Sequence, residues 1–337
     1  GVRSQWVTDY SISLFTRPLN TRRGQCALWT APRLSLFPRP WLSSHRQLYY
    51  SFTFFTSGTS FSMTVFHPYR SGNWRGVVHH QWQEPLQNLD QWLRDNPGTT
   101  VIAKKARTVS RVETPNGVLY VKVIHRLQEK GPAWKMLFTG VKWFLRPSRA
   151  IAVFKITSAM LVKGIGCPEP ILAARRRNAL GWPEDVFISR EVPHPTLLSL
   201  LNTADKIPAR DALIANAAHG IAALHNQGFV HGDCIPLNLC LAPDQSISFL
   251  DNDRTHTMPS LRKTYARFSN IIQFLSRLPF HLQYDGIFAL FCDNYQRNCV
   301  TSLQLTNRQQ RILMKMVLRR LDDLAKLRTH RRRNLQG

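Results

Sequence analysis

A short polar run between hydrophobic segments limits the folds open to this chain more than any other feature of its sequence. Residues 231–238 read His-Gly-Asp-Cys-Ile-Pro-Leu-Asn, so Asn238 follows Asp233 by five positions, and a short apolar strand then ends at Asp251. A lone Asp in a loop is most often a turn residue or a cap. Three carboxylate or amide positions at this mutual spacing, after a helix and around two short strands, indicate one shared site.

This spacing is typical of the catalytic loop of a kinase followed by its metal-binding strand. Phosphoryl transfer needs a carboxylate that accepts the proton of the attacking hydroxyl, and oxygen ligands that hold Mg²⁺ against the phosphates of ATP. We predict that Asp233 is the catalytic base and that Asn238 and Asp251 are the metal ligands. His231 is interpreted as a structural histidine that bonds nearby backbone, and Cys234 as a packing thiol.

A strand that contains a lysine precedes this loop. Residues 118–124 read Val-Leu-Tyr-Val-Lys-Val-Ile, which places Lys122 where a kinase holds the inner phosphates of its nucleotide. An edge-strand lysine that faces solvent would look the same, but the catalytic loop downstream favours the nucleotide ligand. Glu191 and Val192 follow a predicted strand at 185–189, where the hinge of a kinase offers backbone groups to adenine; a plain turn would give the same residues.

Hydrophobic periodicity divides the rest of the chain into a β-rich and a helical block. We predict an α+β, bilobal protein-kinase-like fold with an N-lobe at 99–192 and a C-lobe at 193–337 that ends in a basic helix. Strands are predicted at 99–103, 108–113 and 118–124, the last two joined by a turn at 115–117. Helices are predicted at 82–95, 149–163, 208–226, 261–278 and 307–328. Residues 63–98 are predicted to be an N-terminal helical extension.

Residues 1–62 differ from the rest of the chain in composition. They contain seven Arg, no Lys and a single acid, Asp9, with many Ser, Thr, Phe and Pro. This composition is also typical of a transit peptide, but ordinary sequence begins at Met63. We predict that residues 1–62 are a disordered or upstream-translated extension that does not pack into the core.

Beyond the catalytic loop, three further motifs carry a resemblance to a known family. They are Tyr-Val-Lys at 120–122, Arg-Pro-Ser-Arg-Ala at 146–150 and Lys-Gly-Ile-Gly-Cys-Pro-Glu-Pro at 163–170. With these motifs the sequence resembles the lipopolysaccharide core kinases, the Kdo and heptose kinases of Gram-negative envelopes, over about residues 100–280. The resemblance implies a protein-kinase-like fold, ATP with Mg²⁺, and transfer of the γ-phosphate to a sugar hydroxyl of the lipopolysaccharide inner core.

The sequence departs from a protein kinase at several places. No glycine lies between Gly98 and Gly117, so the glycine-rich loop is missing; Lys104, Lys105 and Arg107 are the cations available to replace it, and a solvated basic hairpin is the alternative. The helix at 149–163 has no Glu to pair with Lys122, which leaves Glu129 as a candidate partner. The metal strand reads Asp-Asn-Asp, and no Ala-Pro-Glu follows, which favours a sugar or small acceptor over a protein.

The formal charge of +25 implies a polyanionic partner, either nucleic acid, anionic lipid or a phosphorylated substrate. No RRM or helix-turn-helix signature supports nucleic acid. The segments 135–155 and 308–333 mix basic with apolar residues as interfacial helices do, although the second is also consistent with a core helix that has a solvated basic end. The resemblance to lipopolysaccharide core kinases implies a lipopolysaccharide core glycolipid as partner. The charge and the two segments are consistent with it, and we predict peripheral contact with an anionic membrane surface at the cytoplasmic face of the inner membrane.

Other functions remain open at this level. The first is a RIO-like or aminoglycoside-phosphotransferase-like kinase of a protein or a small molecule, and the second is a non-catalytic basic kinase-like scaffold. The catalytic-loop residues and Lys122 do not decide among kinases, because those residues serve the nucleotide and not the acceptor.

Overall fold

The computed structural model describes residues 66–104, 107–124, 147–178, 181–204, 207–259 and 263–336. The predicted extension at 1–62 and the candidate partner Glu129 lie outside these ranges, as does the segment 125–146, which holds much of the predicted basic segment 135–155.

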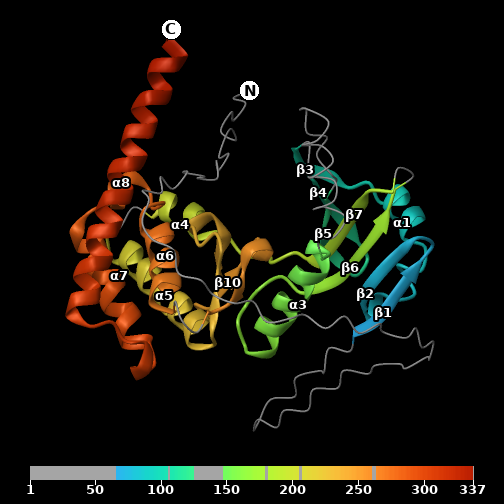
Figure 1. The fold of residues 1–337 in the computed structure, drawn as a ribbon, viewed down its shortest axis with the longest axis horizontal. Helices are drawn as coiled ribbons and strands as arrows, with labels where there is room; N and C mark the ends of the chain where they lie inside the picture. Colours follow the sequence, from blue (N-terminus) through green and yellow to red (C-terminus); the bar gives the residue numbers. More distant parts are fainter. Residues whose placement is uncertain are drawn as a thin grey trace, which may run out of the picture. The chain divides into compact units, whose positions relative to one another are not determined.

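Seven strands of the N-lobe form one antiparallel sheet in the order β1-β2-β6-β7-β5-β4-β3 (Figure 1). Their bounds are β1 (Phe66–Ser71), β2 (Trp74–His79), β3 (Thr99–Lys104), β4 (Arg107–Thr114), β5 (Gly117–Ile124), β6 (Pro170–Arg177) and β7 (Pro183–Arg190). The predicted hairpin at 115–117 joins β4 to β5, and Gly117 has the positive φ that this turn requires, +106°. Strand β6 was not predicted from the residue pattern; it is buried over its first five residues and lacks the alternation of a half-exposed strand.

The predicted helical extension at 63–98 is wrong for its first half. Residues 66–79 form the hairpin β1–β2, and β2 pairs with β6 inside the N-lobe sheet. Pro68 argues against a central strand, but β1 lies at the edge of the sheet, where proline is tolerated. Gly72-Asn73 between the strands was the available hairpin signal.

The predicted helix at 82–95 is shorter in the structure. A 3₁₀ turn at His80–Trp82 is followed by α1 (Leu89–Asp95), which begins after Asn88 because the Asn88 side chain accepts a hydrogen bond from the Gln91 N–H at 3.2 Å. The hairpin and α1 pack together, since Trp74, Leu86 and Leu89 are buried in one cluster with strand residues.

Helix α3 (Arg149–Val162) packs on the sheet and confirms the helix predicted at 149–163. Its buried residues Ala150, Val153 and Phe154 contact Ala173 of β6 and Phe187 of β7. Ser148 caps the helix, and the Ser148 hydroxyl and the Arg149 N–H both donate to the carboxylate of Asp185, at 2.9 Å each. The start of α3 is thereby fixed to β7.

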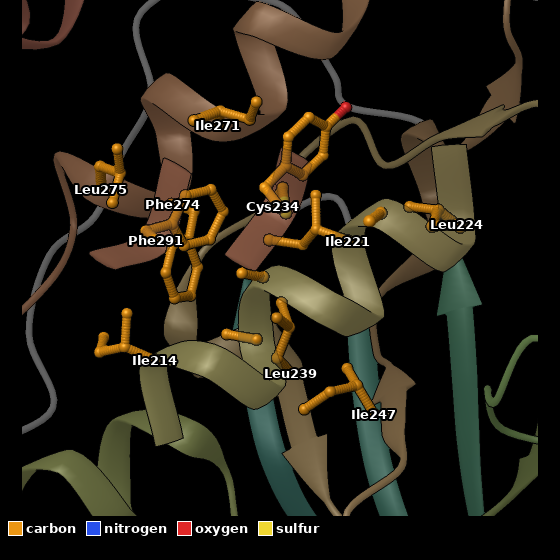
Figure 2. Packing of buried hydrophobic residues seen from close by; sticks show 14 of the residues in the cluster. Ile214, Ile221, Leu224, Cys234, Leu239, Ile247, Ile271, Phe274, Leu275 and Phe291 are labelled. Atoms are coloured by element: carbon orange, nitrogen blue, oxygen red, sulfur yellow. The ribbon is translucent and has the colours of Figure 1, made fainter. Parts of the chain in front are cut away.

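The C-lobe is mostly helical around one hydrophobic core. Its helices are α4 (Leu197–Thr203), α5 (Ile207–Asn226), α6 (Lys263–Leu275), α7 (Asp285–Asn298) and α8 (Asn307–Gln336), with short strands β8 (Phe229–Val230), β9 (Leu239–Leu241), β10 (Ile247–Phe249) and β11 (His256–Thr257). Figure 2 shows the centre of this core, where Ile214 and Ile221 of α5 pack with Phe274 of α6 and Phe291 of α7. Helices α4 and α7 were not predicted from the sequence.

Helix α8 has a buried and an exposed face. Leu313, Val317 and Leu324 are buried in the C-lobe core, whereas Ile312 and Leu318 are exposed. The interpretation of this segment as a core helix is therefore correct for its buried face. Its exposed face is open to contact with a membrane surface. In the described part of the chain, no helix combines the length and the apolar character needed to cross a membrane.

The loop after α3 joins the N-lobe to the small strands of the C-lobe. Gly166 bridges Ser248 of β10 in parallel, and the Phe249 N–H donates to the Gly166 carbonyl at 2.8 Å. A Cβ on Gly166 would lie 2.8 Å from the Ser248 hydroxyl and 2.9 Å from the Ile247 carbonyl, so only glycine allows this approach.

Candidate active site

The predicted catalytic loop follows β8 and is held by its own residues. The side-chain N–H₂ of Asn238 donates to the backbone carbonyl of Asp233 at 2.9 Å and to its carboxylate at 3.3 Å. Because the Asn238 nitrogen is committed to Asp233, its Oδ1 is the atom left to ligate a cation. Asp233 is half-buried. The structure therefore brings the predicted base and one predicted metal ligand into direct contact.

His231 connects this loop to the strand end that carries Asp251. Its Nε2 bonds the Leu250 carbonyl at 2.8 Å, while its Nδ1 accepts from the Asp233 N–H at 3.2 Å. A carbonyl only accepts and an N–H only donates, so the ring is the neutral Nε2–H tautomer. Burial lowers the pKa of His231. This effect is larger than the opposite effects of the hydrogen bond to Leu250 and of the nearby carboxylates, which raise the pKa. The interpretation of His231 as a structural histidine is confirmed.

Two side chains of helix α6 hold the same loop through hydrogen bonds to its backbone. The Asn270 side chain bonds both backbone groups of His231, accepting from its N–H at 2.9 Å and donating to its carbonyl. Gln273 accepts from the Cys234 N–H at 3.0 Å. Cys234 is fully buried, and burial strongly raises the pKa of its thiol, as expected of a packing residue. Sequence reasoning did not identify Asn270 and Gln273, because a polar residue on a helix carries no local signal of what it supports.

Asp251 stands at the end of β10 in a left-handed backbone conformation, with φ at +50° and ψ at +55°. For a residue other than glycine this conformation is uncommon and occurs at functional sites more than elsewhere. Burial alone would raise the pKa of Asp251, but attraction to Lys122, the hydrogen bond from Lys122 and the charge of Arg107 together lower it below its usual range. The carboxylate is thus held in its ionised form.

Lys122 of β5 reaches this strand end across 129 residues of sequence. Its Nζ lies 3.1 Å from Asp251 Oδ1 and 2.5 Å from Asp253 Oδ2. The lysine side chain is only 12% exposed, which rules out the reading of a solvent-facing edge lysine.

Asp253 is the acidic partner that sequence reasoning missed. The lack of a Glu in helix 149–163 was the available signal, because it required another acid for Lys122. Asp253 lies in the 3₁₀ turn η3 (Asn252–Arg254), two positions after Asp251, and its side chain is 9% exposed.

Glu191 and Val192 follow β7, next to the strand that carries Lys122. The Glu191 N–H donates to the Val118 carbonyl at 2.9 Å, and its carboxylate accepts from Arg111 Nε at 3.0 Å and from the Tyr120 hydroxyl at 3.3 Å. The Glu191 side chain therefore belongs to the N-lobe, and its N–H is not free for adenine. Among the described residues, the Val192 N–H has no hydrogen-bond partner, so the prediction for this pair stands on the Glu191 carbonyl and the Val192 N–H.

An antiparallel N-lobe sheet with a buried lysine, a helical C-lobe, and a loop and strand end that carry Asp233, Asn238 and Asp251 define a protein-kinase-like fold. No protein-family model matches this chain, and no curated protein matches it.

Two solved structures align with this chain. A structure described as WaaP in complex with acyl carrier protein aligns with a TM-score of 0.53 and 15% identity, over 74% of this chain and 99% of that chain. The bifunctional kinase-methyltransferase WbdD aligns with a TM-score of 0.38 and 18% identity, over 63% of this chain and 47% of that one. The similarity to WaaP confirms the predicted α+β kinase-like fold, with its β-rich N-lobe and helical C-lobe.

Proposed function

We propose that this protein is an ATP-dependent phosphotransferase that phosphorylates a sugar hydroxyl, Kdo or heptose, of the lipopolysaccharide inner core. One observation supports the phosphotransferase above all others: Lys122 of the N-lobe contacts Asp251 of the C-lobe, and His231 ties the strand end of Asp251 to the loop of Asp233. The acceptor class rests on the resemblance of the sequence motifs to lipopolysaccharide core kinases.

The residues present fit Mg²⁺. This ion prefers oxygen ligands and usually takes one or two protein side chains together with phosphate oxygens and water. Asn238 Oδ1 and the Asp251 carboxylate would supply the protein ligands. Among the described residues, no cluster of three or more His, Cys, Asp or Glu side chains that could hold a metal occurs.

The other site residues serve the proton transfer and the nucleotide. Asp233 accepts the proton of the acceptor hydroxyl, and the Asn238 N–H₂ orients its carboxylate. Lys122 contacts phosphate oxygens of the bound nucleotide, whose γ-phosphoryl group is the one transferred. The Glu191 carbonyl and the Val192 N–H bind adenine at the hinge.

The acceptor would be reached at the cytoplasmic face of the inner membrane. The formal charge of +25 favours an anionic glycolipid and an anionic surface. The exposed face of α8, which carries Ile312 and Leu318 beside Arg311, Lys315 and Arg319, is suited to peripheral contact.

Mass spectrometry of core oligosaccharide tests the proposed acceptor. A strain that lacks the gene should lose one phosphate from its core, and the wild-type gene should restore it. Asp233→Ala should not restore it, because loss of a general base costs about 10²–10⁴-fold in rate. Asp244→Ala is the matched control, since Asp244 is an exposed turn residue of the β9–β10 hairpin.

The possible outcomes separate the candidate functions. An unchanged core phosphate count in the deletion strain would refute the acceptor and leave the RIO-like or aminoglycoside-phosphotransferase-like alternative. Restoration by Asp233→Ala would show that phosphoryl transfer does not depend on this base, and would favour the scaffold.

A further inference from the structure

Three cations from three separate elements of the N-lobe converge on one carboxylate oxygen. Asp253 Oδ2 lies 2.5 Å from Lys122 Nζ of β5, 3.4 Å from a guanidinium nitrogen of Arg149 at the start of α3, and 3.9 Å from one of Arg107 at the start of β4. Asp251 is the second acid of this cluster, at 3.1 Å from Lys122.

The charges of this cluster do not balance. Three cations face two carboxylates, and like charges held together repel each other more strongly near a protein surface than in bulk water. The central groups are largely buried, with side-chain exposures of 9% for Asp253 and 12% for Lys122, whereas Arg107 and Arg149 are 29% and 37% exposed. The two arginines therefore keep N–H groups within reach of an additional anion.

The arginines also stand where two usual parts of a kinase site are missing. Arg107 begins β4, and the sequence between β3 and β4 contains no glycine, so it offers no glycine-rich loop for phosphate. Helix α3 contributes Arg149 to the site instead of a Glu, and the acid comes from Asp253 of the C-lobe. In this chain the helix therefore supplies the cation of the ion pair, whereas in a protein kinase it supplies the acid. A guanidinium matches phosphate oxygens in geometry as well as in charge.

We propose that Arg107 and Arg149, gathered with Lys122 on Asp253, bind the phosphates of the nucleotide and replace the missing glycine-rich loop. This inference rests on the proposed phosphotransferase function. Asp253 acts as a positioning residue, because it holds the three cations in place through direct contact with each.

Nucleotide binding to the full chain, measured by calorimetry without acceptor, tests this inference. Arg107→Gln and Arg149→Gln should each raise the Kd for MgATP about tenfold, as expected for the loss of one charge-assisted hydrogen bond, and leave the Kd for adenosine within about twofold. Arg70→Gln is the matched control, because Arg70 is exposed on β1, at the opposite edge of the same sheet from β3. Arg149→Lys keeps the charge and should retain part of the affinity.

A double variant separates direct phosphate binding from simple neutralisation of Asp253. If Arg149 only neutralises Asp253, then Asp253→Asn should restore MgATP binding to Arg149→Gln. If Arg149 contacts phosphate, the deficit should persist when Arg149→Gln/Asp253→Asn is compared with Asp253→Asn alone.

Each result bears on one claim. A wild-type chain that fails to bind MgATP would overturn the proposed function. If wild type binds MgATP and the Gln variants bind it as tightly as the Arg70→Gln control, this inference alone is overturned. It is also overturned if Asp253→Asn restores MgATP binding to Arg149→Gln. If a Gln variant melts far below wild type, the corresponding Lys variant is measured instead. We expect it to bind MgATP more weakly than wild type and adenosine equally well.

Discussion

At the residue scale, two buried histidines stabilise the catalytic loop in their neutral forms. His225 of α5 bonds Asn270 at 3.1 Å and the Tyr295 hydroxyl at 2.8 Å, and Asn270 in turn holds the backbone of His231. Burial lowers the pKa of His225 to about 3, although the hydrogen bond to Asn270 acts in the opposite direction. The network that supports the loop therefore depends on an unprotonated ring.

This network predicts a dependence of stability on pH. The pKa of His225 is about 3 in the folded chain and about 6.5 in the unfolded chain, so between these values the unfolded chain binds more protons. Stability should fall as the pH drops from 6.5 toward 3, by up to about 1.4 kcal/mol per pH unit from this group. Urea unfolding at pH 4.5–7 should show a smaller slope for His225→Gln than for wild type. Equal slopes would contradict the prediction, and above pH 7 the two curves should run parallel.

At the element scale, helix α8 both closes the C-lobe core and presents a basic surface. The buried positions Leu313, Val317 and Leu324 recur at helical spacing. The exposed charged positions between them are Lys315, Arg319, Asp322 and Asp323. Such a division is common for a surface helix. On this face the apolar residues Ile312 and Leu318 are exposed beside the basic ones. They would contribute apolar burial in a membrane interface, beside the attraction of the basic residues for anionic lipid.

Sedimentation with lipid vesicles tests this face. The double variant Lys315→Glu/Arg319→Glu should bind vesicles that contain anionic lipid at least about 30-fold more weakly than wild type, because each of the two basic residues near such a surface contributes about 1 kcal/mol. The control Arg70→Glu/Arg94→Glu makes the same charge change at exposed positions of β1 and α1. Equal weakening in both double variants would indicate a response to net charge alone. Vesicles of neutral lipid should bind neither wild type nor the variants.

At the scale of the whole molecule, residues 66–98 are part of the N-lobe and not an extension attached to it. Gly76 of β2 approaches β6 so closely that a Cβ there would lie 1.9 Å from the Ala173 carbonyl. Arg176 of β6 stacks on the Trp74 ring with its guanidinium carbon 4.4 Å from the ring centroid, and it pairs with Asp90 of α1 and with Glu184 of β7. The hairpin and α1 are thus joined to the sheet by backbone pairing, apolar burial and ion pairs.

Truncation distinguishes the two parts of the N-terminal region. A chain that begins at Met63 should unfold with the cooperativity of the full chain, whereas a chain that begins at Thr99 should be insoluble or melt far lower. The second truncation removes Trp74, Val78, Trp82, Leu86 and Leu89, all buried, and each such side chain contributes about 1.5–3 kcal/mol. That total is comparable to the whole stability of a typical domain, about 5–15 kcal/mol. A folded chain from Thr99 would contradict this role, and dependence on residues before Met63 would contradict the predicted extension.

The features of this protein that depend on neighbours along the chain could be predicted from the sequence alone. Strands β3, β4 and β5 follow from alternation and a Pro-Asn-Gly turn, and helices α3 and α5 from apolar spacing and a terminal glycine. Asp233 and Asn238 are five residues apart, so their contact is a property of one loop. Each of these features is set by local backbone preferences, which a short stretch of sequence contains in full.

Contacts between residues far apart in the sequence could not be predicted and emerge from the folded chain. The contacts of Lys122 with Asp251 and Asp253 span 129 and 131 residues, and the role of Asp253 follows from those contacts alone. The place of β1 and β2 in the sheet depends on their pairing with β6, since a hairpin is only marginally stable by itself. Long-range contacts of this kind arise when the buried faces of separate elements pack together, and no short segment of sequence specifies its partner.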